Sequence, residues 1–579
     1  MTKNVAEQLV DMLVEAGIKR IYAVTGDSLN HLNDAVRRND KIKWIHVRHE
    51  EVGAYAAAAE AELSDGLACC AGSCGPGHVH LINGLYDANK SHVPVLAIAS
   101  TINTNQMGVS YFQDTNTTKL FDDCSVYNQM ITSANQAQRI VQTAMQHAIS
   151  KKGVAVIGLP GDVSEQEAVE SNTSKKAFIV KPQLTPNPQE IEVLADVINQ
   201  SQNITLFCGF GAKDALTEII ALAEKIKAPI AYTFRSKMHL QPNNPFEIGM
   251  TGLLGQPTAF NSMHESDLLL LLGTDFPYND FLPTDLKIMQ LDTAPELLGR
   301  RCQLDYGFQG DVKQTLQLLN PLIKEKEEVS FLKKQLELHI KVQKQMQTFI
   351  EEQGSENSIQ PEYLASLIDQ HAQADAIFTL DTGMTCVWAA RFINNKFQRQ
   401  FLGSFNHGSM ANAMPMAIGA SLAHPEKQVF ALCGDGGISM LLGDLATIKQ
   451  YNLPIKIIVF NNRSLGMVKL EMEVQGLPDN ETDLVNPDFA LVAQAMGFAG
   501  VNIHDPATLE EALVEALKIE GPVLLNVFTN PNALAMPPKV EWNQILGMTK
   551  SMSKLMLVGR FDEVWDTVKS NYKHLKGPL

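Results

Sequence analysis

The stretch GDGGISMLLGDLATIKQYNLPIKIIVFNNRS, residues 434–464, decides the fold. An apolar run over 429–433 precedes its glycines and predicts a buried parallel strand. Apolar residues then recur at helical spacing over 440–448, and a second apolar strand follows over 455–460. The stretch therefore predicts one strand–helix–strand step of a parallel sheet. Its polar ends fall at the carboxyl ends of adjacent strands, where open α/β sheets bind ligands.

The two polar ends carry groups that suit a hard cation and a phosphate. Asp435 offers a carboxylate oxygen, and Asn462, 27 positions later, offers an amide oxygen. With the backbone carbonyl of Ser464 they form a ligand set for octahedral Mg²⁺ that leaves room for phosphate oxygens. Gly436 and Gly437 let backbone N–H groups approach a phosphate at a helix N-terminus. Asn, Asp and Gly also dominate ordinary turns, but their spacing across two strand ends favours a metal–diphosphate site.

With these residues the chain resembles the thiamine-diphosphate enzyme superfamily. The resemblance implies that thiamine diphosphate and Mg²⁺ are cofactors, with Asp435, Asn462 and Ser464 around the metal. It also puts a bulky apolar side chain beneath the bent cofactor. Met410 matches that position, although a Met is more often a plain core residue. The implied thiamine contacts are Glu50, Gly408, Ser409, Met410, Asp435, Gly436, Gly437, Asn462, Leu465, Gly466, Met467 and Val468.

The composition is that of a large globular protein. Of the 579 residues, 45% are hydrophobic and 19% charged, and the length predicts several domains. The net charge of −17 argues against nucleic-acid binding. No apolar run reaches the length of a membrane span, and residues 1–20 form an amphipathic helical pattern rather than a signal peptide. Eight irregularly placed cysteines are typical of a reducing cytoplasm.

Helical and strand patterns alternate along most of the chain. In the middle of the chain the apolar runs predict strands over 204–211, 229–234, 267–274 and 287–292. In the last part they predict six strands, in the strings AIFTLDTG, QFLGSFN, QVFALCGDGG, IKIIVFNN, AGVNIH and PVLLNVF. This alternation predicts three doubly wound parallel-sheet α/β domains, with a single helix over 77–89 in the first. A proline-rich stretch at 182–189 marks a linker. The charged helix at 324–357 is interpreted as a connector with a solvated face. The predicted domains are 1–182, 183–342 and 343–530, followed by an amphipathic tail at 531–579.

A carboxylate is needed opposite the aminopyrimidine ring of thiamine, because protonating that ring yields the form that deprotonates the thiazolium carbon. The resemblance assigns this role to a glutamate at a strand end, and Glu50 in the string RHEEV matches it. Glu50 and Glu51 could instead be first-turn carboxylates that a helix dipole stabilises. Given the metal–diphosphate pattern, Glu50 rather than Glu51 is the predicted acid.

The string YFQD at 111–114 carries an aromatic side chain followed by an amide. Phe112 and Gln113 could wall and polarise the pocket of a small ketoacid. They could equally anchor a loop. The resemblance favours the first interpretation, because both match residues that line the site in pyruvate-oxidising members.

Over nearly its full length the chain resembles bacterial flavin-dependent pyruvate dehydrogenases that reduce quinone, also called pyruvate oxidases. The matching strings include AVTGDSLN, CAGSCGPG, GSFNHGSMANAMP, CGDGG and FNN. The resemblance assigns the pyrimidine to the first domain, FAD to the middle domain, and the diphosphate and Mg²⁺ to the third. A full G-x-G-x-x-G is missing from the middle domain, so FAD rests on the resemblance. The implied FAD contacts are Thr251, Gly252, Leu253, Leu254, Thr274, Asp275, Phe276, Pro277, Tyr278 and Asp292.

One position departs from the resemblance. After the two asparagines, related enzymes carry an aromatic residue that is thought to move toward the cofactors on activation, whereas this chain has Met467. Met467 is included among the predicted catalytic residues with Glu50, Phe112 and Gln113. Electron transfer does not require an aromatic ring, but its rate and gating depend on what replaces it.

The tail carries apolar residues at roughly helical spacing between 552 and 568, with five lysines and one arginine around them. This pattern suits an amphipathic helix that lies on an anionic membrane surface. A terminal helix packed on the protein's own core has the same periodicity. The resemblance favours reversible membrane contact, because a lipid-dissolved quinone is reached there.

Together these features predict a peripheral-membrane flavoprotein on the inner face of the cell membrane. The expected reaction is oxidative decarboxylation of pyruvate to acetate and CO₂, with electrons passed through FAD to a membrane quinone. The expected partners are pyruvate, quinone, a phospholipid surface and further copies of the chain in a homotetramer, with a site between two subunits. Alternatives are a phosphate- and oxygen-dependent pyruvate oxidase making acetyl phosphate, an acetolactate synthase, and a non-catalytic thiamine-binding scaffold protein.

Overall fold

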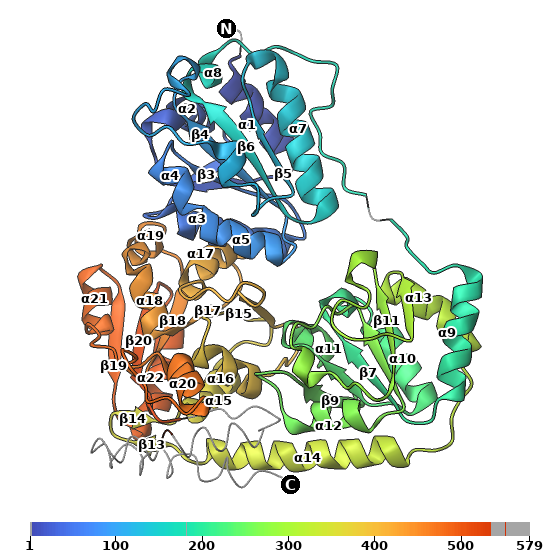
Figure 1. Ribbon diagram of the computed structural model, residues 1–579. Helices are drawn as coiled ribbons and strands as arrows, with labels where there is room; N and C mark the ends of the chain where they lie inside the picture. The colour runs from blue at the N-terminus through green and yellow to red at the C-terminus, as the bar shows by residue number, and fades with distance from the viewer. Residues whose placement is uncertain (1–2, 181, 534–550, 552–579) are drawn as a thin grey trace.

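The computed structural model describes residues 3–180, 182–533 and 551. These residues form three α/β domains, each built on a six-stranded parallel sheet (Figure 1). The predicted fold of three doubly wound parallel-sheet domains is therefore confirmed. The predicted amphipathic tail lies outside the described residues, apart from 531–533 and Ser551.

The sheet of the first domain has the strand order β2-β1-β3-β4-β6-β5. The strands are β1 (Arg20–Ala23), β2 (Lys43–His46), β3 (Ala68–Gly72), β4 (Val95–Thr101), β5 (Tyr127–Met130) and β6 (Val154–Pro160). The main helices are α1 (Val5–Glu15), α2 (Asn30–Arg37), α3 (Glu50–Ser64), α4 (Pro76–His80), α5 (Ile82–Lys90) and α7 (Ala134–Lys151). The single helix predicted over 77–89 was wrong. The helix is interrupted at Leu81, so α4 and α5 are separate.

The sheet of the middle domain has the order β12-β11-β10-β7-β8-β9. Its strands are β7 (Ile204–Cys208), β8 (Ile230–Tyr232), β9 (Glu247–Met250), β10 (Leu268–Leu272), β11 (Lys287–Asp292) and β12 (Tyr306–Gln309). Its helices include α9 (Pro188–Gln200), α10 (Leu216–Ile226), α12 (Pro257–Glu265) and α13 (Val312–Leu319). The apolar patterns predicted β7, β8, β10 and β11. They missed the edge strands β9 and β12, which are short and contain glycine and polar residues.

The third domain has the order β16-β15-β17-β18-β20-β19, and all six of these strands were predicted. They are β15 (Ile377–Leu380), β16 (Gln400–Gly403), β17 (Val429–Gly434), β18 (Ile455–Asn461), β19 (Ala499–Ile503) and β20 (Val523–Phe528). The helices include α15 (Pro361–His371), α16 (Met384–Phe392), α17 (Ala413–Ala423), α18 (Asp435–Met440), α19 (Leu445–Gln450), α20 (Gly466–Val474), α21 (Phe489–Ala495) and α22 (Pro506–Lys518).

The charged helix α14 (Ser330–Ile350) runs from the middle domain to the third domain (Figure 1). It contacts α12 and β9 of the middle domain and α15 of the third. Leu332, Val342 and Phe349 are buried on its inner face. The interpretation as a connector with a solvated charged face is confirmed, because Lys333, Lys334, Lys341 and Lys344 are exposed on the other side. The helix itself is shorter than the predicted 324–357.

Helix α3 of the first domain packs directly on α17 of the third, and their apolar residues share one core (Figure 1). The two backbones come very close. A Cβ built on Gly419 of α17 would lie 2.1 Å from the carbonyl oxygen of Ala56 in α3. Any side chain at this position would force the helices apart, so this glycine sets the distance between the two domains.

Gly419→Ala is expected to destabilise the protein by about 1–3 kcal/mol, as overpacking does in other cores. The matched control is Gly443→Ala, because a Cβ at Gly443 meets nothing within 4 Å. Denaturant unfolding of both variants and the wild type measures the difference. Equal unfolding midpoints for the two variants would contradict the assigned contact.

Candidate active site

The carboxyl ends of β17 and β18 bring the predicted metal ligands together. The strands run parallel with Gly434 opposite Phe460, and α18 begins at Asp435. The buried Asp435 carboxylate accepts two hydrogen bonds at Oδ2, from the Arg463 N–H at 2.7 Å and from Asn486 Nδ2 at 2.8 Å. Oδ1 accepts the N–H of Gly436 at 3.0 Å. The β18–α20 turn is thus held directly on Asp435.

The turn after β18 carries the other two predicted ligands. Asn462 Oδ1 accepts the Ser464 N–H at 3.1 Å, and Arg463 between them has a positive φ of 57°. Ser464 forms a bridge to Asp483. Its buried Oγ has no hydrogen-bond partner among the described residues.

These groups fit a hard cation. An oxygen of an ionised carboxylate has two lone pairs, so the two donors at Asp435 Oδ2 fill that oxygen while Oδ1 keeps a free position. Burial raises the pKa of Asp435, and a bound cation would favour its ionised form. The part of the chain that the structure describes contains no cluster of three His, Cys, Asp or Glu residues. A cation held here by one carboxylate and amide oxygens would therefore complete its shell with phosphate oxygens and water.

Apolar side chains from three segments close over Gly436. A Cβ at this position would lie 2.9 Å from Leu465 Cδ2, 3.2 Å from Met410 Cε and 3.3 Å from Leu484 Cδ1. The structure therefore brings the predicted residues Met410 and Leu465 to the predicted diphosphate turn. Leu484 was missed, because it lies in an irregular loop with no periodic pattern.

Asp381, at the end of β15, is a further residue that the sequence analysis missed. A Cβ at Gly437 would lie 1.7 Å from Asp381 Oδ2, so no side chain fits at position 437. Asp381 is fully buried, and its Oδ2 has no hydrogen-bond partner among the described residues. Burial raises the pKa of this carboxyl to about 7. Its position after a predicted strand, in the string LDTG, was the available signal.

The predicted residues Gly408, Ser409 and Met410 lie in the loop between β16 and α17. Gly408 has a positive φ of 75°, which explains the need for glycine there. The carbonyl of Ser409 accepts hydrogen bonds from Thr382 Oγ1 at 2.7 Å and from Asn412 Nδ2 at 2.9 Å. The loop is therefore fixed against the end of β15, next to Asp381.

Glu50 lies in the first domain as the first residue of α3 and is buried. Its Oε2 lies 2.9 Å from His80 Nδ1. Its Oε1 lies near Gly77 in the turn after β3, 3.1 Å from where a Cβ at that glycine would be. His49 stacks on His80 with 4.4 Å between ring centroids. Glu50 thus points into a polar corner built from β3, α3 and α4.

The neighbouring Glu51 makes different contacts. Its Oε1 accepts Asn83 Nδ2 at 2.7 Å, and the same nitrogen donates to Ser409 Oγ of the third domain at 2.9 Å. Glu51 therefore helps to hold two domains together. This leaves Glu50 as the carboxylate of the pair that is not engaged in that bridge.

The structure places Gln113 beside the corner of Glu50 but leaves Phe112 in solvent. The Cys74 thiol donates to Gln113 Oε1 at 3.1 Å, and Gln113 has a positive φ of 62°. A Cβ at Gly75 would meet Gln113 at 2.9 Å. The Phe112 side chain is 78% exposed, as are other apolar residues of this loop, such as Val109 at 72%. Within the described part of one chain, Phe112 is therefore not covered by the other predicted residues.

Helix α20 carries the remaining predicted thiamine contacts. Gly466 is its first residue, and a Cβ there would lie 2.9 Å from Asn462 Nδ2. Met467 is partly buried against the core of the third domain. Val468 is 45% exposed. Met467 is thus held by packing, one turn away from the predicted metal ligands.

The predicted FAD residues lie on loops that follow β9, β10 and at the end of β11. Because all strands of the sheet are parallel, these loops share the carboxyl edge. Gly252 packs under Phe276 and Tyr278, and Asp275 pairs with Arg301 at 2.9 Å. The buried Thr251 Oγ1 has no partner among the described residues, and burial raises the pKa of Asp292. The unpaired Thr251 hydroxyl and the buried Asp292 carboxyl at this edge fit a ligand rich in hydroxyl groups.

The sequence analysis missed a close approach between the backbone after β7 and the backbone after β10, at the same edge of the sheet. Gly209 and Gly211 follow β7, and the Gly211 N–H donates to the carbonyl of Gly273, after β10, at 2.9 Å. A Cβ at Gly209 would lie 2.3 Å from that carbonyl oxygen. Strands β7 and β10 are neighbours where the strand order reverses, which is the position at which such sheets bind ligands. The two glycines in the string CGFGA, residues 208–212, were the available sequence signal for this approach.

The carboxyl edge of the middle sheet faces both other domains. Arg235, after β8, lies over the ring of Phe210 and donates to the Ser91 carbonyl of the first domain at 2.9 Å. Arg391 of the third domain donates to the Gly255 carbonyl at 3.1 Å. Phe234 contacts Phe405 edge to face at 4.9 Å. The middle domain therefore contacts the first and third domains through the segments that follow β8 and β9.

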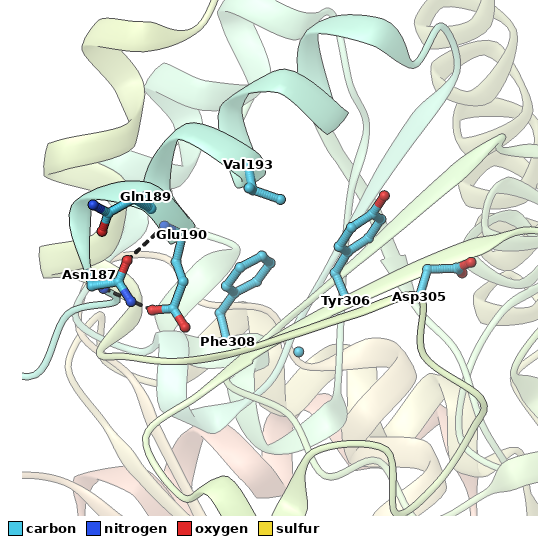
Figure 2. Close-up of a pocket in the computed structure, with 8 residues that line it drawn as sticks. Asn187, Gln189, Glu190, Val193, Asp305, Tyr306 and Phe308 are labelled. Atoms are coloured by element: carbon cyan, nitrogen blue, oxygen red, sulfur yellow. Dashed lines mark hydrogen bonds between the residues drawn. The ribbon is translucent and has the colours of Figure 1, made fainter.

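A surface hollow of about 420 Å³ lies away from these loops, between the start of α9 and β12. Figure 2 shows Tyr306 and Phe308 beside Val193, with the Asn187–Glu190 capping hydrogen bonds at one end. None of its lining residues was predicted for a site. Asn187 and Glu190 are already used to cap α9, and Asp305 Oδ2 accepts the Ile288 N–H at 2.9 Å. The hollow is therefore not assigned to the candidate site.

Comparison with known protein families gives three matches along the chain. Residues 3–121 match the thiamine pyrophosphate enzyme N-terminal TPP binding domain. Residues 191–319 match the central domain of the same enzymes, and residues 381–527 match their C-terminal TPP binding domain. The matched segments contain the Glu50 corner, the middle-domain loops and the Asp435 turn.

Several full-length proteins are similar to the chain. It is 34% identical to a putative thiamine pyrophosphate-containing protein, YdaP, of Bacillus subtilis, over 95% of this chain and 96% of that protein. It is 30% identical to pyruvate oxidase of Lactiplantibacillus plantarum, over 91% of this chain and 88% of the oxidase. It is 28% identical to chloroplastic acetolactate synthase of Arabidopsis thaliana, over 90% of this chain and 81% of the synthase.

Asp381→Asn is expected to change how stability depends on pH. Because burial raises the pKa of Asp381 from 3.8 to about 7, the folded protein keeps a proton that the unfolded chain has lost. The free energy of unfolding therefore falls as pH rises through this window, at up to about 1.4 kcal/mol per pH unit. Asparagine carries no such proton, so the variant gains stability relative to the wild type as the pH rises from 3.8 to about 7, between the unfolded and the folded pKa of Asp381. Unfolding midpoints of the variant and the wild type are measured against pH without added cofactor. If the two sets of midpoints run parallel across this range, Asp381 does not hold the extra proton.

Proposed function

Because the chain belongs to the thiamine pyrophosphate enzyme family, we propose that it oxidatively decarboxylates pyruvate to acetate and CO₂ and delivers the electrons to a membrane quinone. In the balanced reaction, pyruvate and water give acetate, CO₂, two protons and two electrons, which reduce the quinone to a quinol. Thiamine diphosphate, when bound, supplies the electron sink that makes loss of CO₂ from a 2-ketoacid feasible, and FAD supplies the two-electron acceptor.

The observation that carries the proposal is the convergence of the three domains at the carboxyl edge of the middle sheet. A two-electron oxidation needs an acceptor close to the site of decarboxylation, and an acceptor bound at this edge would lie next to the other two domains. Here Arg235, after β8, contacts the first domain, and Arg391 of the third domain contacts the Leu254 and Gly255 carbonyls of the loop that carries the unpaired Thr251 Oγ1. The similarity to pyruvate oxidase supports the same assignment.

Each predicted residue has a defined task in this proposal. Asp435, Asn462 and the Ser464 carbonyl hold Mg²⁺ and through it the diphosphate, while Met410 supports the cofactor. Glu50 exchanges a proton with the aminopyrimidine nitrogen through its carboxyl group. Gln113 orients the ketoacid, and Phe112 covers it.

A second subunit completes the site in this proposal. Within one chain Glu50 hydrogen-bonds to His80 of its own domain, and Phe112 is exposed in an apolar loop. A loop with exposed Val109 and Phe112 is a surface that another copy of the chain would bury. A homotetramer, in which Glu50 of one subunit meets the Asp435 turn of the next, satisfies both observations.

The proposed membrane contact concerns the tail at 531–579, which lies almost entirely outside the described residues. Among the residues that the structure describes, no helix is long and apolar enough to cross a bilayer. We propose peripheral binding through the lysine-rich tail, on the inner face of the cell membrane, as the route to a quinone dissolved in the lipid.

Steady-state assays distinguish the candidate functions. The purified protein is expected to oxidise pyruvate with ferricyanide, and faster with a quinone in anionic phospholipid vesicles. Deleting residues 550–579 is expected to abolish the activation by lipid and leave the ferricyanide rate. Acetyl phosphate with peroxide would identify the oxygen-dependent oxidase, acetolactate would identify the synthase, and bound cofactors without turnover would identify a scaffold protein. Each of these outcomes overturns the quinone proposal.

Glu50→Gln is expected to lower kcat by about 10²- to 10⁴-fold, which is the usual contribution of a positioned acid or base. The isosteric control is Glu51→Gln, which weakens a domain contact and leaves the proton transfer intact. Thiamine diphosphate binding, followed by protein fluorescence, should persist in Glu50→Gln. Equal losses of kcat in both variants would exclude Glu50 as the acid.

A further inference from the structure

Four asparagine side chains form a continuous hydrogen-bonded row that begins at Asp435. We call this row the asparagine chain; its members are Asn486, Asn461, Asn526 and Asn502. They come from the loop before α21, from β18, from β20 and from β19, respectively. No single pattern in the sequence links them, because they lie on four different segments.

The hydrogen bonds of the asparagine chain are short and direct. Asn486 Nδ2 donates to Asp435 Oδ2 at 2.8 Å and to Asn461 Oδ1 at 3.0 Å. Asn461 Nδ2 donates to Asn526 Oδ1 at 2.9 Å. Asn526 Nδ2 donates to Asn502 Oδ1 at 2.8 Å, and Asn502 Nδ2 donates to Asp488 Oδ2 at 2.7 Å. The row thus runs across three strands from one carboxylate to another.

Both ends of the row accept hydrogen bonds and donate none, because an ionised carboxylate has no donor. Asp488 therefore requires the NH₂ group of Asn502, and this requirement orients each amide in turn. Asp435 requires that the NH₂ group of Asn486 point toward it. The orientations that start from Asp488 lead to the same placement of the Asn486 amide. Flipping any one amide would set two acceptors or two donors against each other. The row consequently has a single self-consistent polarity.

The middle of the row is out of reach of water. Asn526 is 0% exposed and Asn461 is 1% exposed, so an unpaired amide there would cost about 1–3 kcal/mol. The far end is also fixed, because Asp488 Oδ1 accepts the Leu491 N–H at 2.9 Å and caps α21. A rigid row of this kind holds its first member, Asn486, in one position.

We propose that the asparagine chain positions the Asp435 carboxylate for the metal ion, with Asn486 as its contact and Asn526 as its buried centre. Asn486 and the Arg463 N–H together fill Oδ2. Oδ1 is thereby left as the oxygen that faces the cation, and the carboxylate cannot rotate. These asparagines are positioning residues, since they act through Asp435. The inference rests on the proposed Mg²⁺ site.

The test measures the Mg²⁺ dependence of thiamine diphosphate binding to the full-length protein by titration calorimetry. Asn486→Ala removes the contact itself at a partly exposed position, so the variant folds. Asn526→Leu breaks the row at its centre. The matched control is Thr379→Val, which removes a buried side-chain hydrogen bond, from Thr379 Oγ1 to the Ala413 carbonyl at 2.7 Å, in the same sheet but off the row.

Asn486→Ala is expected to raise the half-saturating Mg²⁺ concentration by about 10- to 100-fold, as is typical when the partner of a metal ligand is removed. Asn526→Leu is expected to shift it in the same direction by a smaller factor, and Thr379→Val to leave it unchanged. At saturating Mg²⁺, all variants should bind thiamine diphosphate with the wild-type affinity. A purely structural defect would not separate the two affinities in this way.

Three outcomes would overturn the inference. The first is a wild-type Mg²⁺ dependence in Asn486→Ala. The second is an equal shift in Asn526→Leu and Thr379→Val, which would mean that any loss of packing in the sheet has this effect. The third is wild-type binding of thiamine diphosphate that needs no divalent cation, in which case the proposed metal site itself fails. The first two leave the proposed function standing, so the two failures can be told apart.

Discussion

The contact between α3 and α17 is the constraint on which the candidate site depends. Gly419 lets the two helix backbones touch at Ala56, and the apolar faces of both helices enter one core. Glu50 is the first residue of α3, and the loop with Met410 leads directly into α17. Within one chain this helix pair therefore fixes Glu50 relative to the Met410 loop, although they lie more than 300 positions apart in the sequence. In the proposed assembly the two halves of each site come from different subunits, so the helix pair sets how one chain contributes to two sites.

Hydrogen bonds between distant segments further fix the residues that the α3–α17 pair brings together. Asn83 connects Glu51 to Ser409, and Thr382 and Asn412 fix the loop of Ser409. Asp435 is held by Arg463 and Asn486 in the same manner. After these pairings Asp435 Oδ1 keeps one free position beside the Gly436 N–H, and Asp381 Oδ2 has no partner among the described residues. Most of the polar groups named here therefore fix the positions of other residues, and only a few are left for a ligand.

The sequence predicted the parts of this structure that follow from local patterns. All six strands of the third domain were found from apolar runs, and the turn at Asp435 was found from its glycines and the asparagines after the next strand. The sequence analysis missed Asp381, Leu484, Asn486 and the approach of Gly209 to Gly273. These contacts join segments that are remote in sequence, and no periodicity records them. Phe112 was predicted for the site but is exposed in the described part of one chain. Its predicted role would need a surface from another subunit.

Helix α14 bears on the distance between the middle domain and the third domain. It is 21 residues long, which corresponds to about 30 Å of continuous helix, and it contacts both the middle and the third domains. A helical strut keeps its length under thermal motion, whereas a flexible linker samples a range of lengths. In the proposed reaction electrons would pass between these two domains, and the rate of electron tunnelling falls steeply with separation. A strut of this kind would then make that transfer insensitive to thermal fluctuation of the domain spacing.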